Sequence, residues 1–373
     1  MKTFVRHAVA LLALTAVCQG RLALAEDYYR VSGDGQSATL VGDQKAVEQG
    51  SPICNPCNLP PCCEEACAEG CGCGGRSGCC CDLGCDECPP IGIVGSVGFD
   101  SFKGISDFTL PSNFGVVTGV NAGAPMPGLS EYGFGWQTGI SYGIYDFDGR
   151  IDGLHSASSQ QQTFVTTGFF RKAHGDQRLS FGIVYDWMFN TDWGIVANDP
   201  TLGQWRGQVE YALSGCNAVG VWACQRDLGS VQQVDGFLVS DRAISQVNMF
   251  WHHKFECGSD SWIWFGIPDH GRYNGDGSLA DWTFGVTLQA PITDRMALYA
   301  NASYLHPSDA AGAAGAVEAG YDVSMGVAWY FGGSARSNKI NGSCWTPYMG
   351  VANNSTFLVE QGFSGIAAPA LAP

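Results

Sequence analysis

The segment Tyr321–Phe331, YDVSMGVAWYF, predicts a β-strand with one apolar face and one small or polar face. Side chains of a strand point alternately to its two faces, so a period of two separates these sets. A strand between lipid and a polar lumen has this pattern, with aromatic residues near both interfaces. A strand of a soluble β-sandwich could share it, so one strand leaves both alternatives open. The apolar face holds Tyr321, Val323, Met325, Val327, Trp329 and Phe331, and the other holds Asp322, Ser324, Gly326, Ala328 and Tyr330.

The composition favours strands and turns over helices. The 373 residues include 51 glycines and 12% aromatic residues, but only 14% charged residues. The net charge is −16, whereas binding to nucleic acid or to an anionic lipid surface needs a basic face. The sequence therefore predicts no nucleic-acid partner.

The N-terminus predicts a secretory signal peptide over residues 1–25. Lys2 and Arg6 precede the apolar run 8–17, and residues 23–25 offer an Ala-Leu-Ala cleavage site. Lipidation of Cys18 is an alternative, although the residues before it lack the leucine and the small last residue of a lipoprotein signal. The run is too short to cross a bilayer, and no other run of about 20 apolar residues exists. Any insertion into a membrane must therefore use strands.

Residues 26–90 are expected to form a linker and a cysteine-rich periplasmic segment. Twelve of the 17 cysteines lie here, with almost no large apolar side chain, so only cross-links could order the segment. Zinc is suggested by two Cys-x-x-Cys pairs. Disulfides are favoured because the exported chain enters an oxidising compartment, and some could join it to other envelope proteins. The candidates are Cys54, Cys57, Cys62, Cys63, Cys67, Cys71, Cys73, Cys79, Cys80, Cys81, Cys85 and Cys88.

Residues 91–332 predict an all-β, antiparallel up-and-down transmembrane barrel of about 12 strands. Long and short connections alternate along the chain, as in outer-membrane barrels with long outer loops and tight periplasmic turns. With the first loop long, both chain ends should lie on the tight-turn side, so the tail 333–373 is expected to be irregular and periplasmic. The predicted strands are 91–102, 114–124, 131–145, 161–172, 178–189, 205–213, 218–225, 244–256, 261–268, 281–290, 294–304 and 320–331.

Four further cysteines follow the cysteine-rich segment. Cys216 and Cys257 fall at predicted tight turns on one rim, and Cys344 lies in the tail. If strand 218–225 spans the barrel, Cys216 and Cys224 are too far apart to bond, because a disulfide needs Cα atoms within about 7 Å. If they bond, the segment is a closed loop and there are fewer strands. Both alternatives stay open.

The predicted luminal face is mainly small and polar, which indicates a hydrated interior. A conducting pore is consistent with it, but a barrel of this size can also be plugged by side chains or by its own loops. The charged candidates for the luminal lining are Arg178, Asp186, Arg295 and Asp322.

No catalytic or metal-binding constellation stands out, so we expect no enzyme activity and no cofactor. Adjacent strand residues point to opposite faces, so His252 and His253 should not converge on a metal, and one of them should face the lumen. The Asp- and Gly-rich stretch 269–277 lacks the ligand spacing of a calcium loop and is read as a turn. The strand serines lack the G-x-S-x-G elbow of a hydrolase.

Two resemblances follow from local motifs. The residues Ser324, Gly326, Trp329 and Phe331 resemble the last-strand signal of outer-membrane proteins, which implies recognition by the barrel-assembly machinery. Here, however, 42 residues follow Phe331 instead of the chain ending there. The segments 113–119 (NFGVVTG) and 142–150 (YGIYDFDGR), behind a cysteine-rich leader, are similar to uncharacterised planctomycete-type envelope proteins, which supply no site residues.

The sequence therefore favours a porin-like channel in the outer membrane, with membrane lipid and the barrel-assembly machinery as partners. A structural envelope protein, anchored through its cysteine-rich segment, is the alternative. An outer-membrane enzyme is the least supported. Pairing of strand 91–102 with strand 320–331 would distinguish the barrel from an open sandwich.

Overall fold

The computed structural model divides the chain into two compact units, residues 1–86 and 87–373. In the first unit only a small hairpin is described, in which β1 (Tyr29–Val31) pairs with β2 (Ala38–Leu40). The predicted signal peptide and all twelve cysteines of the cysteine-rich segment lie outside the described residues. The structure describes residues 29–31, 38–40 and 91–365, the last range with gaps at 106–111, 148–149, 152–155, 158, 174–176, 195, 235, 256–257, 270–278, 308–318 and 337–344.

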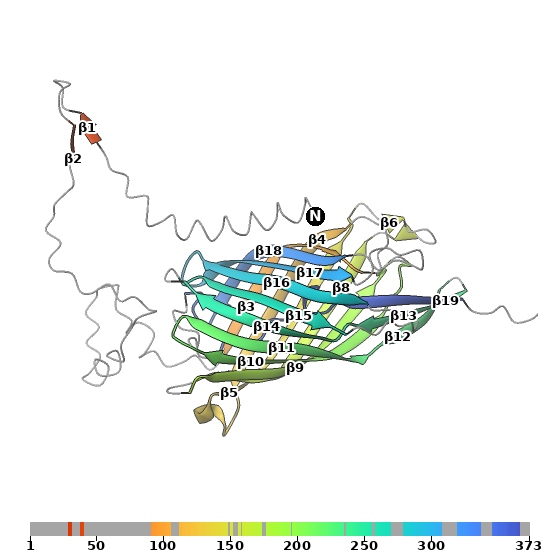
Figure 1. Cartoon of the computed structure of the whole chain (residues 1–373), viewed down its shortest axis with the longest axis horizontal. Coiled ribbons are helices and arrows are strands. Elements are labelled where there is room, and N and C mark those ends of the chain that lie inside the picture. The colour runs from red at the N-terminus through yellow and green to blue at the C-terminus, as the bar shows by residue number, and fades with distance from the viewer. Residues whose placement is uncertain are drawn as a thin grey trace, which may run out of the picture. The chain divides into compact units, whose positions relative to one another are not determined.

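The second unit contains a closed barrel of twelve antiparallel strands (Figure 1). Its last strand, β18 (Gly320–Phe331), pairs along its length with its first, β3 (Gly92–Lys103), which confirms the predicted closure and fold class. The strands between them are β4 (Asn113–Pro125), β5 (Phe134–Tyr145), β8 (Gln160–Arg171), β9 (Leu179–Thr191), β10 (Thr201–Ala212), β11 (Asn217–Leu228), β14 (Gln246–Lys254), β15 (Asp260–Pro268), β16 (Ala280–Pro291) and β17 (Met296–Pro307).

The two rims of the barrel differ in their connections, as expected from the alternation of long and short loops. We call the rim with the turns 126–133, 172–178, 213–216, 255–259 and 292–295 the tight-turn rim. The first of these turns contains the short helix η2 (Ser130–Tyr132). The opposite, long-loop rim carries a hairpin of β6 (Arg150–Ile151) and β7 (Ser156–Ala157). It also carries β12 (Ser230–Val234) and β13 (Phe237–Ala243).

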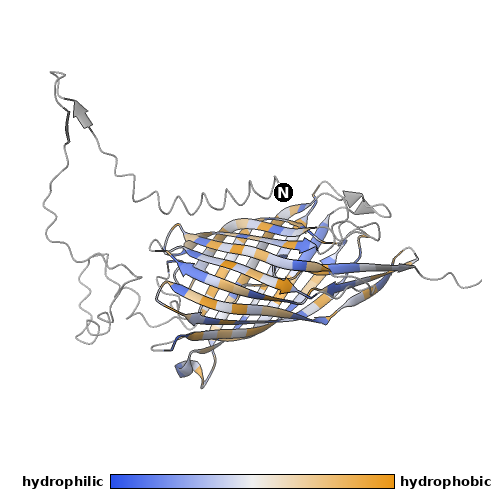
Figure 2. Ribbon diagram, in the orientation of Figure 1, coloured by the Kyte–Doolittle hydropathy of each residue, from blue (hydrophilic) through white to orange (hydrophobic). Residues whose placement is uncertain are grey.

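The strands expose apolar side chains outward and bury polar side chains inward. In β5, Trp136 is 47% exposed and Ile140 45%, whereas Gln137 between them is fully buried. Ribbon colours accordingly alternate between hydrophobic and hydrophilic along the strands (Figure 2). A soluble protein buries its large apolar side chains, so this inverted pattern requires an apolar surrounding. In the described residues, no helix is long and apolar enough to cross a membrane.

Two glycines face each other at the seam between the first and last strands. Gly98 pairs with Gly326, and a Cβ at either position would lie within 2.8 Å of the Tyr299 hydroxyl. The two glycines thus leave room for the Tyr299 side chain on the luminal side of the barrel, and a larger residue at either position would collide with it. Packing against Tyr299 therefore accounts for the glycine in the β18 motif without reference to an assembly factor.

The C-terminal tail differs from the expected organisation. Beyond the long-loop rim, β19 (Val359–Gly365) pairs with β13, which also pairs with β12, in a separate three-stranded sheet (Figure 1). Since β18 ends at the tight-turn rim, residues 345–365 reach from one rim to the other. The expectation of a tail below the tight-turn rim is wrong for these residues, whereas the expected irregular structure is found in 345–358 and is replaced by a strand only in β19.

The structure decides the arrangement of two cysteines. β11 spans the barrel, Cys224 is a free, buried thiol within it, and Cys216 is disulfide-bonded at the tight-turn rim. They are therefore not bonded to each other, as expected for a spanning strand. The partner of Cys216 lies outside the described residues.

Candidate functional site: a lumen occupied by the C-terminal segment

Residues 345–358, which we call the luminal segment, run through the inside of the barrel. At the tight-turn rim, the backbone of Trp345 and Thr346 lies so close to Gly92 and Gly123 that a Cβ at either glycine would collide with it. These glycines therefore admit the chain between the strand ends. The luminal segment ends where β19 begins, at the long-loop rim.

The first anchor of the luminal segment is the side-chain amide of Gln137. Its Oε1 accepts hydrogen bonds of 3.0 Å from both Tyr348 N and Met349 N, and its Nε2 donates to Met349 O at 2.7 Å. Asn121 Nδ2 donates to the same carbonyl at 2.9 Å. The wall thus satisfies backbone groups that would otherwise be buried without partners, which keeps an extended chain inside a barrel at low energetic cost.

The second anchor is a buried ion pair. Arg206 Nε and Nη2 donate to the two carboxylate oxygens of Asp186 at 2.8 and 3.1 Å. The same Nη2 donates to Gly350 O at 2.8 Å. Thr166 Oγ1 donates to Asp186 Oδ1 at 2.6 Å and accepts from Ala352 N at 3.0 Å. Because Asp186 is fully buried, this bidentate pair compensates for a charge that water does not reach.

The third anchor lies nearer the long-loop rim. Asn354 Nδ2 donates to Asp100 Oδ2 and to Gln162 Oε1, both at 3.0 Å. Ser355 Oγ donates to Asp322 Oδ2 at 2.5 Å. Each of the three anchors joins the luminal segment to a different part of the wall, so the segment is held along its length.

A charged cluster lies between the anchors and the tight-turn rim. His252 Nδ1 is 2.9 Å from Glu210 Oε1, and His252 Nε2 is 2.7 Å from Asp260 Oδ1. A ring with a carboxylate at both nitrogens donates from both only as the imidazolium. Lys254 Nζ donates to the other oxygen of Asp260. Trp262 stacks on the His252 ring at 4.0 Å between centroids.

The luminal segment reaches this cluster through Tyr348 and Thr346. Tyr348 OH donates to Glu210 Oε2 at 3.4 Å. Lys172 Nζ donates to Thr346 Oγ1 at 2.9 Å, and burial, with repulsion by Lys254, lowers the pKa of Lys172 to about 7. This end of the lumen thus carries most of its cationic side chains.

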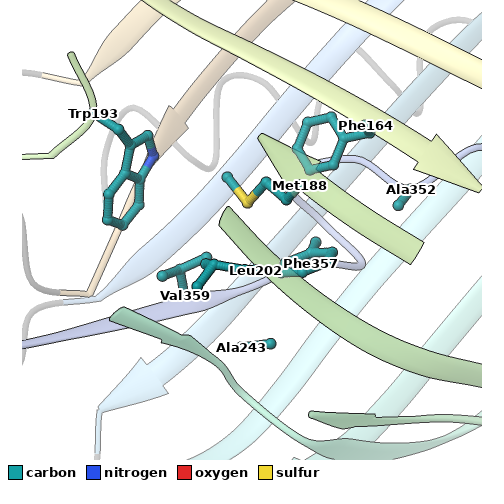
Figure 3. Close-up of a cluster of buried hydrophobic side chains, with 8 residues drawn as sticks. All are labelled: Phe164, Met188, Trp193, Leu202, Ala243, Ala352, Phe357 and Val359. Atoms are coloured by element: carbon teal, nitrogen blue, oxygen red, sulfur yellow. The ribbon is translucent and has the colours of Figure 1, made fainter. Parts of the chain in front are cut away.

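An apolar cluster holds the luminal segment where it leaves the barrel (Figure 3). Phe357 is 1% exposed and contacts luminal side chains of β8, β9 and β10 that break the polar pattern of the wall. Burial of a phenylalanine side chain contributes about 1.5–3 kcal/mol. The cluster comprises Phe164, Met188, Trp193, Leu202, Ala243, Ala352, Phe357 and Val359.

A buried carboxylate, Asp241 in β13, lies beside β19. Asn198 Nδ2 donates to its Oδ2 at 2.6 Å, and Gln361 Nε2 donates to its Oδ1 at 2.9 Å. Burial raises the pKa of Asp241 to about 6, although both hydrogen bonds act in the opposite direction. The folded state therefore binds a proton more strongly than the unfolded state between about pH 4 and 6, and its extra stability is lost as the pH rises through 6.

We expect β19 to dock less firmly on β13 at pH 7.5 than at pH 4.5. Because folding raises the pKa of Asp241 from 3.8 to about 6, the equilibrium constant for opening of β19 should be about 25-fold larger at pH 7.5 than at pH 4.5. Hydrogen exchange of the amides at 359–362, corrected for intrinsic rates, measures this difference. Asp241→Asn should remove it, whereas the exposed control Asp199→Asn should keep it. Equal pH dependence in both variants would contradict the assignment.

The luminal segment narrows the lumen without filling it. A cavity of about 500 Å³ remains beside it. Its lining includes the polar residues Ser96 and Gln289 and the aromatic residues Trp262, Tyr299 and Tyr330. Aliphatic residues such as Val94, Val117 and Val351 complete the lining, so the remaining space is of mixed polar and apolar character.

Two of the four predicted lumen-lining residues are on the luminal wall. Asp186 and Asp322 are buried there, in the second and third anchors. Arg178 and Arg295 are instead exposed in tight turns, because the strands begin at Leu179 and Met296. The expectation that these arginines line the lumen is wrong.

The predicted assembly-signal residues lie on both faces of β18. Ser324 and Gly326 share the luminal parity of Asp322, and Trp329 and Phe331 share the outward parity of Met325. Their recognition by an assembly factor stays a prediction.

Sequence reasoning missed several luminal charges. Strand parity could have found them, because in β10 polar residues at 204, 206, 208 and 210 alternate with the outward residues Trp205, Val209 and Tyr211. His252 is buried in the lumen and His253 is half-buried on the other face, as predicted. The missed residues are Asp100, Arg206, Glu210, Lys254 and Asp260.

The described residues contain no group of three or more His, Cys, Asp or Glu side chains placed to hold a metal. Most of the stretch 269–277 lies outside them, but its first residue, Asp269, pairs with Arg226 at 2.7 Å.

Residues 94–359 match the model of a family of unknown function, DUF6666. No curated protein matches the chain. Three similar solved structures are a KdgM porin, a NanC porin and an outer membrane channel from Pseudomonas putida F1. The first has 10% identity, covers 64% of this chain and 99% of that chain, and has a TM-score of 0.36. The second has 11% identity, covers 63% of this chain and 98% of that chain, and has a TM-score of 0.39. The third has 10% identity, covers 65% of this chain and 94% of that chain, and has a TM-score of 0.41. Such values assign neither cargo nor mechanism.

Proposed function

The chain belongs to DUF6666, a family of unknown function, and we propose that it is a porin-like, non-catalytic channel of the outer membrane. Its lumen is narrowed by its own C-terminal segment. The observation that carries the proposal is the combination of an exposed apolar outer wall with a polar lumen that keeps a cavity of about 500 Å³. An apolar outer wall around a polar, partly open interior is typical of a channel-forming barrel in lipid.

Orientation in the membrane follows from the two rims. Outer-membrane barrels have tight turns in the periplasm and long loops outside. On this basis the tight-turn rim, where β3 begins, faces the periplasm. The sheet of β12, β13 and β19 then lies on the outer side. The signal peptide at 1–25 would direct export, and the motif in β18 would be read by the barrel-assembly machinery.

A structural role is the second candidate, because the three anchors hold the luminal segment along its whole length. A barrel kept closed by that segment would serve as an anchor for the cysteine-rich residues 54–88. Non-reducing gels of intact envelopes test this role. It predicts species larger than the monomer that disappear on reduction, and a monomer alone would contradict it.

Cysteine substitutions at two neighbouring residues test the channel directly. Ser96 lines the cavity, and Val97 is 40% exposed on the outer wall. In outer-membrane vesicles, a small sulfonated thiol reagent should label Ser96→Cys and leave Val97→Cys unmodified, because lipid covers the latter. Peptide-resolved mass spectrometry separates these sites from the native cysteines. Labelling of Val97→Cys, or none at Ser96→Cys, would refute a water-filled lumen within lipid.

A further inference from the structure

Two carboxylates lie side by side in the lumen, near the long-loop rim. Asp100 pairs with Ser324 across the seam, two residues from Asp322, so the two acids occupy diagonal positions on neighbouring strands. Asp100 is 4% exposed and Asp322 1%. Neither forms an ion pair with a cationic side chain of the described residues, unlike Asp186 and Asp260, which have Arg206 and Lys254.

Donors from other residues all approach Oδ2 of each carboxylate, and the two carboxyl groups also lie within hydrogen-bonding reach of each other. Tyr145 OH donates to Asp100 Oδ2 at 2.7 Å, and Asn354 Nδ2 donates to it at 3.0 Å. Ser355 and Asn301 donate to Asp322 Oδ2. The Oδ1 atoms of both carboxylates are buried without a hydrogen-bond partner among the described atoms.

A third oxygen near them also lacks a partner. Ser303 is 3% exposed and stands directly opposite Asp322 in the pairing of β17 with β18, on the same luminal face. Its Oγ is buried without a hydrogen-bond partner among the described atoms. A hydroxyl beside a carboxylate normally donates to it, so Ser303 Oγ and Asp322 Oδ1 are two buried oxygens at adjacent positions that still need a partner.

The negative charge of the two carboxylates also indicates a bound cation. Two buried like charges are costly unless a positive charge compensates for them. A single shared proton would neutralise one carboxylate and leave the other. A divalent cation neutralises both and takes oxygens that point toward it.

We propose that Asp100 Oδ1, Asp322 Oδ1 and Ser303 Oγ bind one Ca²⁺ ion, which ties the third anchor of the luminal segment to the wall. The three ligands are all oxygen atoms, which Ca²⁺ prefers, whereas Zn²⁺ and Cu²⁺ are bound mainly through nitrogen or sulfur. Ca²⁺ takes 6–8 oxygens, so water completes its shell. Since Asn354 and Ser355 hold the other oxygens of the same carboxylates, the ion stabilises the seated luminal segment.

Terbium and calcium provide the test on the purified full chain in detergent. Tyr145 lies in contact with Asp100, so Tb³⁺ bound at this site should emit on tyrosine excitation, and excess Ca²⁺ should quench the emission. Ca²⁺ should also raise the midpoint of thermal unfolding, and a chelator should lower it. Asp322→Asn should reduce the Tb³⁺ emission at least tenfold. Asp294→Asn, which removes a carboxylate that is 82% exposed, is the matched control and should retain it.

Two outcomes would overturn the proposal. The first is an emission that is the same in Asp322→Asn and Asp294→Asn. The second is a thermal midpoint unaffected by Ca²⁺ but dependent on pH in the parent chain and not in Asp322→Asn, which would identify a shared proton instead. If Asp322→Asn fails to fold, Ser303→Ala should weaken Tb³⁺ binding and leave the tyrosine contact in place. None of these readings requires the barrel to conduct.

Discussion

A chain that ends after Arg336 is expected to conduct ions several-fold better than the full chain in planar lipid bilayers. The luminal segment occupies the barrel between the rims, and its removal leaves a twelve-strand lumen lined by polar side chains. A lumen of this size admits water once nothing fills it. The truncation should raise conductance more than any single substitution in the lumen, because it removes the whole constriction rather than one contact.

Two further chains make the conductance test specific. A chain that ends after Gly365 keeps the luminal segment and β19, so it should conduct like the full chain. Gln137→Ala removes three hydrogen bonds to the luminal segment at unchanged length and should raise the conductance by a smaller factor. Heat-modifiable migration in gels checks that each barrel is folded. Equal conductance in the full chain and in a folded chain that ends after Arg336 would contradict a channel narrowed by its tail.

Replacement of Asp186 by alanine is expected to destabilise the folded barrel by about 3–5 kcal/mol, because it leaves the Arg206 guanidinium buried without its carboxylate. Both side chains are at most 7% exposed, and Thr166, Gln204 and Gly350 depend on the same network. Urea unfolding in detergent or lipid vesicles, followed by tryptophan fluorescence, measures the change in the free energy of unfolding.

The exposed pair of Asp294 and Arg336 is the matched control for this loss. Its N–O distance is 3.3 Å and its aspartate is 82% exposed. Exposed pairs contribute about 0–1 kcal/mol, so Asp294→Ala should change the free energy of unfolding little. The double variant Asp186→Leu with Arg206→Met should recover part of the loss, since it leaves no buried charge. A loss in Asp186→Ala no larger than that in Asp294→Ala would refute the role of the buried pair.

The barrel could be predicted from sequence because lipid imposes a period of two on every strand. In β5, for example, Trp136 and Ile140 point outward, and Gln137 points into the lumen. The boundaries were harder to predict where that period fails. β10 begins at Thr201 instead of near 205, and its Leu202 is a fully buried luminal residue. Val184 and Met188 in β9 are likewise buried on the luminal face, and Met188 and Leu202 pack with Phe357 in one apolar cluster. These apolar residues on an otherwise polar luminal face were the one sign in the sequence that a segment of the chain lies inside the barrel.

The luminal segment itself could not be predicted, because the first and second anchors hold it through its backbone. Met349 O, Gly350 O and Thr356 O accept hydrogen bonds from Gln137, Arg206 and Gln204, and any residue could supply these carbonyls. Backbone groups leave no pattern in a sequence. Asp186 and Asp322 were found by parity, whereas Arg178 and Arg295 depended on strand ends, which sequence locates least well.

The route of the tail also constrains the order of assembly. β18 closes the wall at the seam with β3, and the chain then returns through the ring that this closure makes. The luminal segment must therefore lie inside the barrel before β18 pairs with β3. Otherwise it must pass through the closed barrel as an unfolded chain. Threaded chains are rare in proteins because each needs such a step. A stably folded domain joined to the C-terminus could not pass through the closed barrel. Such a domain could therefore lie beyond the long-loop rim only if the barrel closes around the luminal segment.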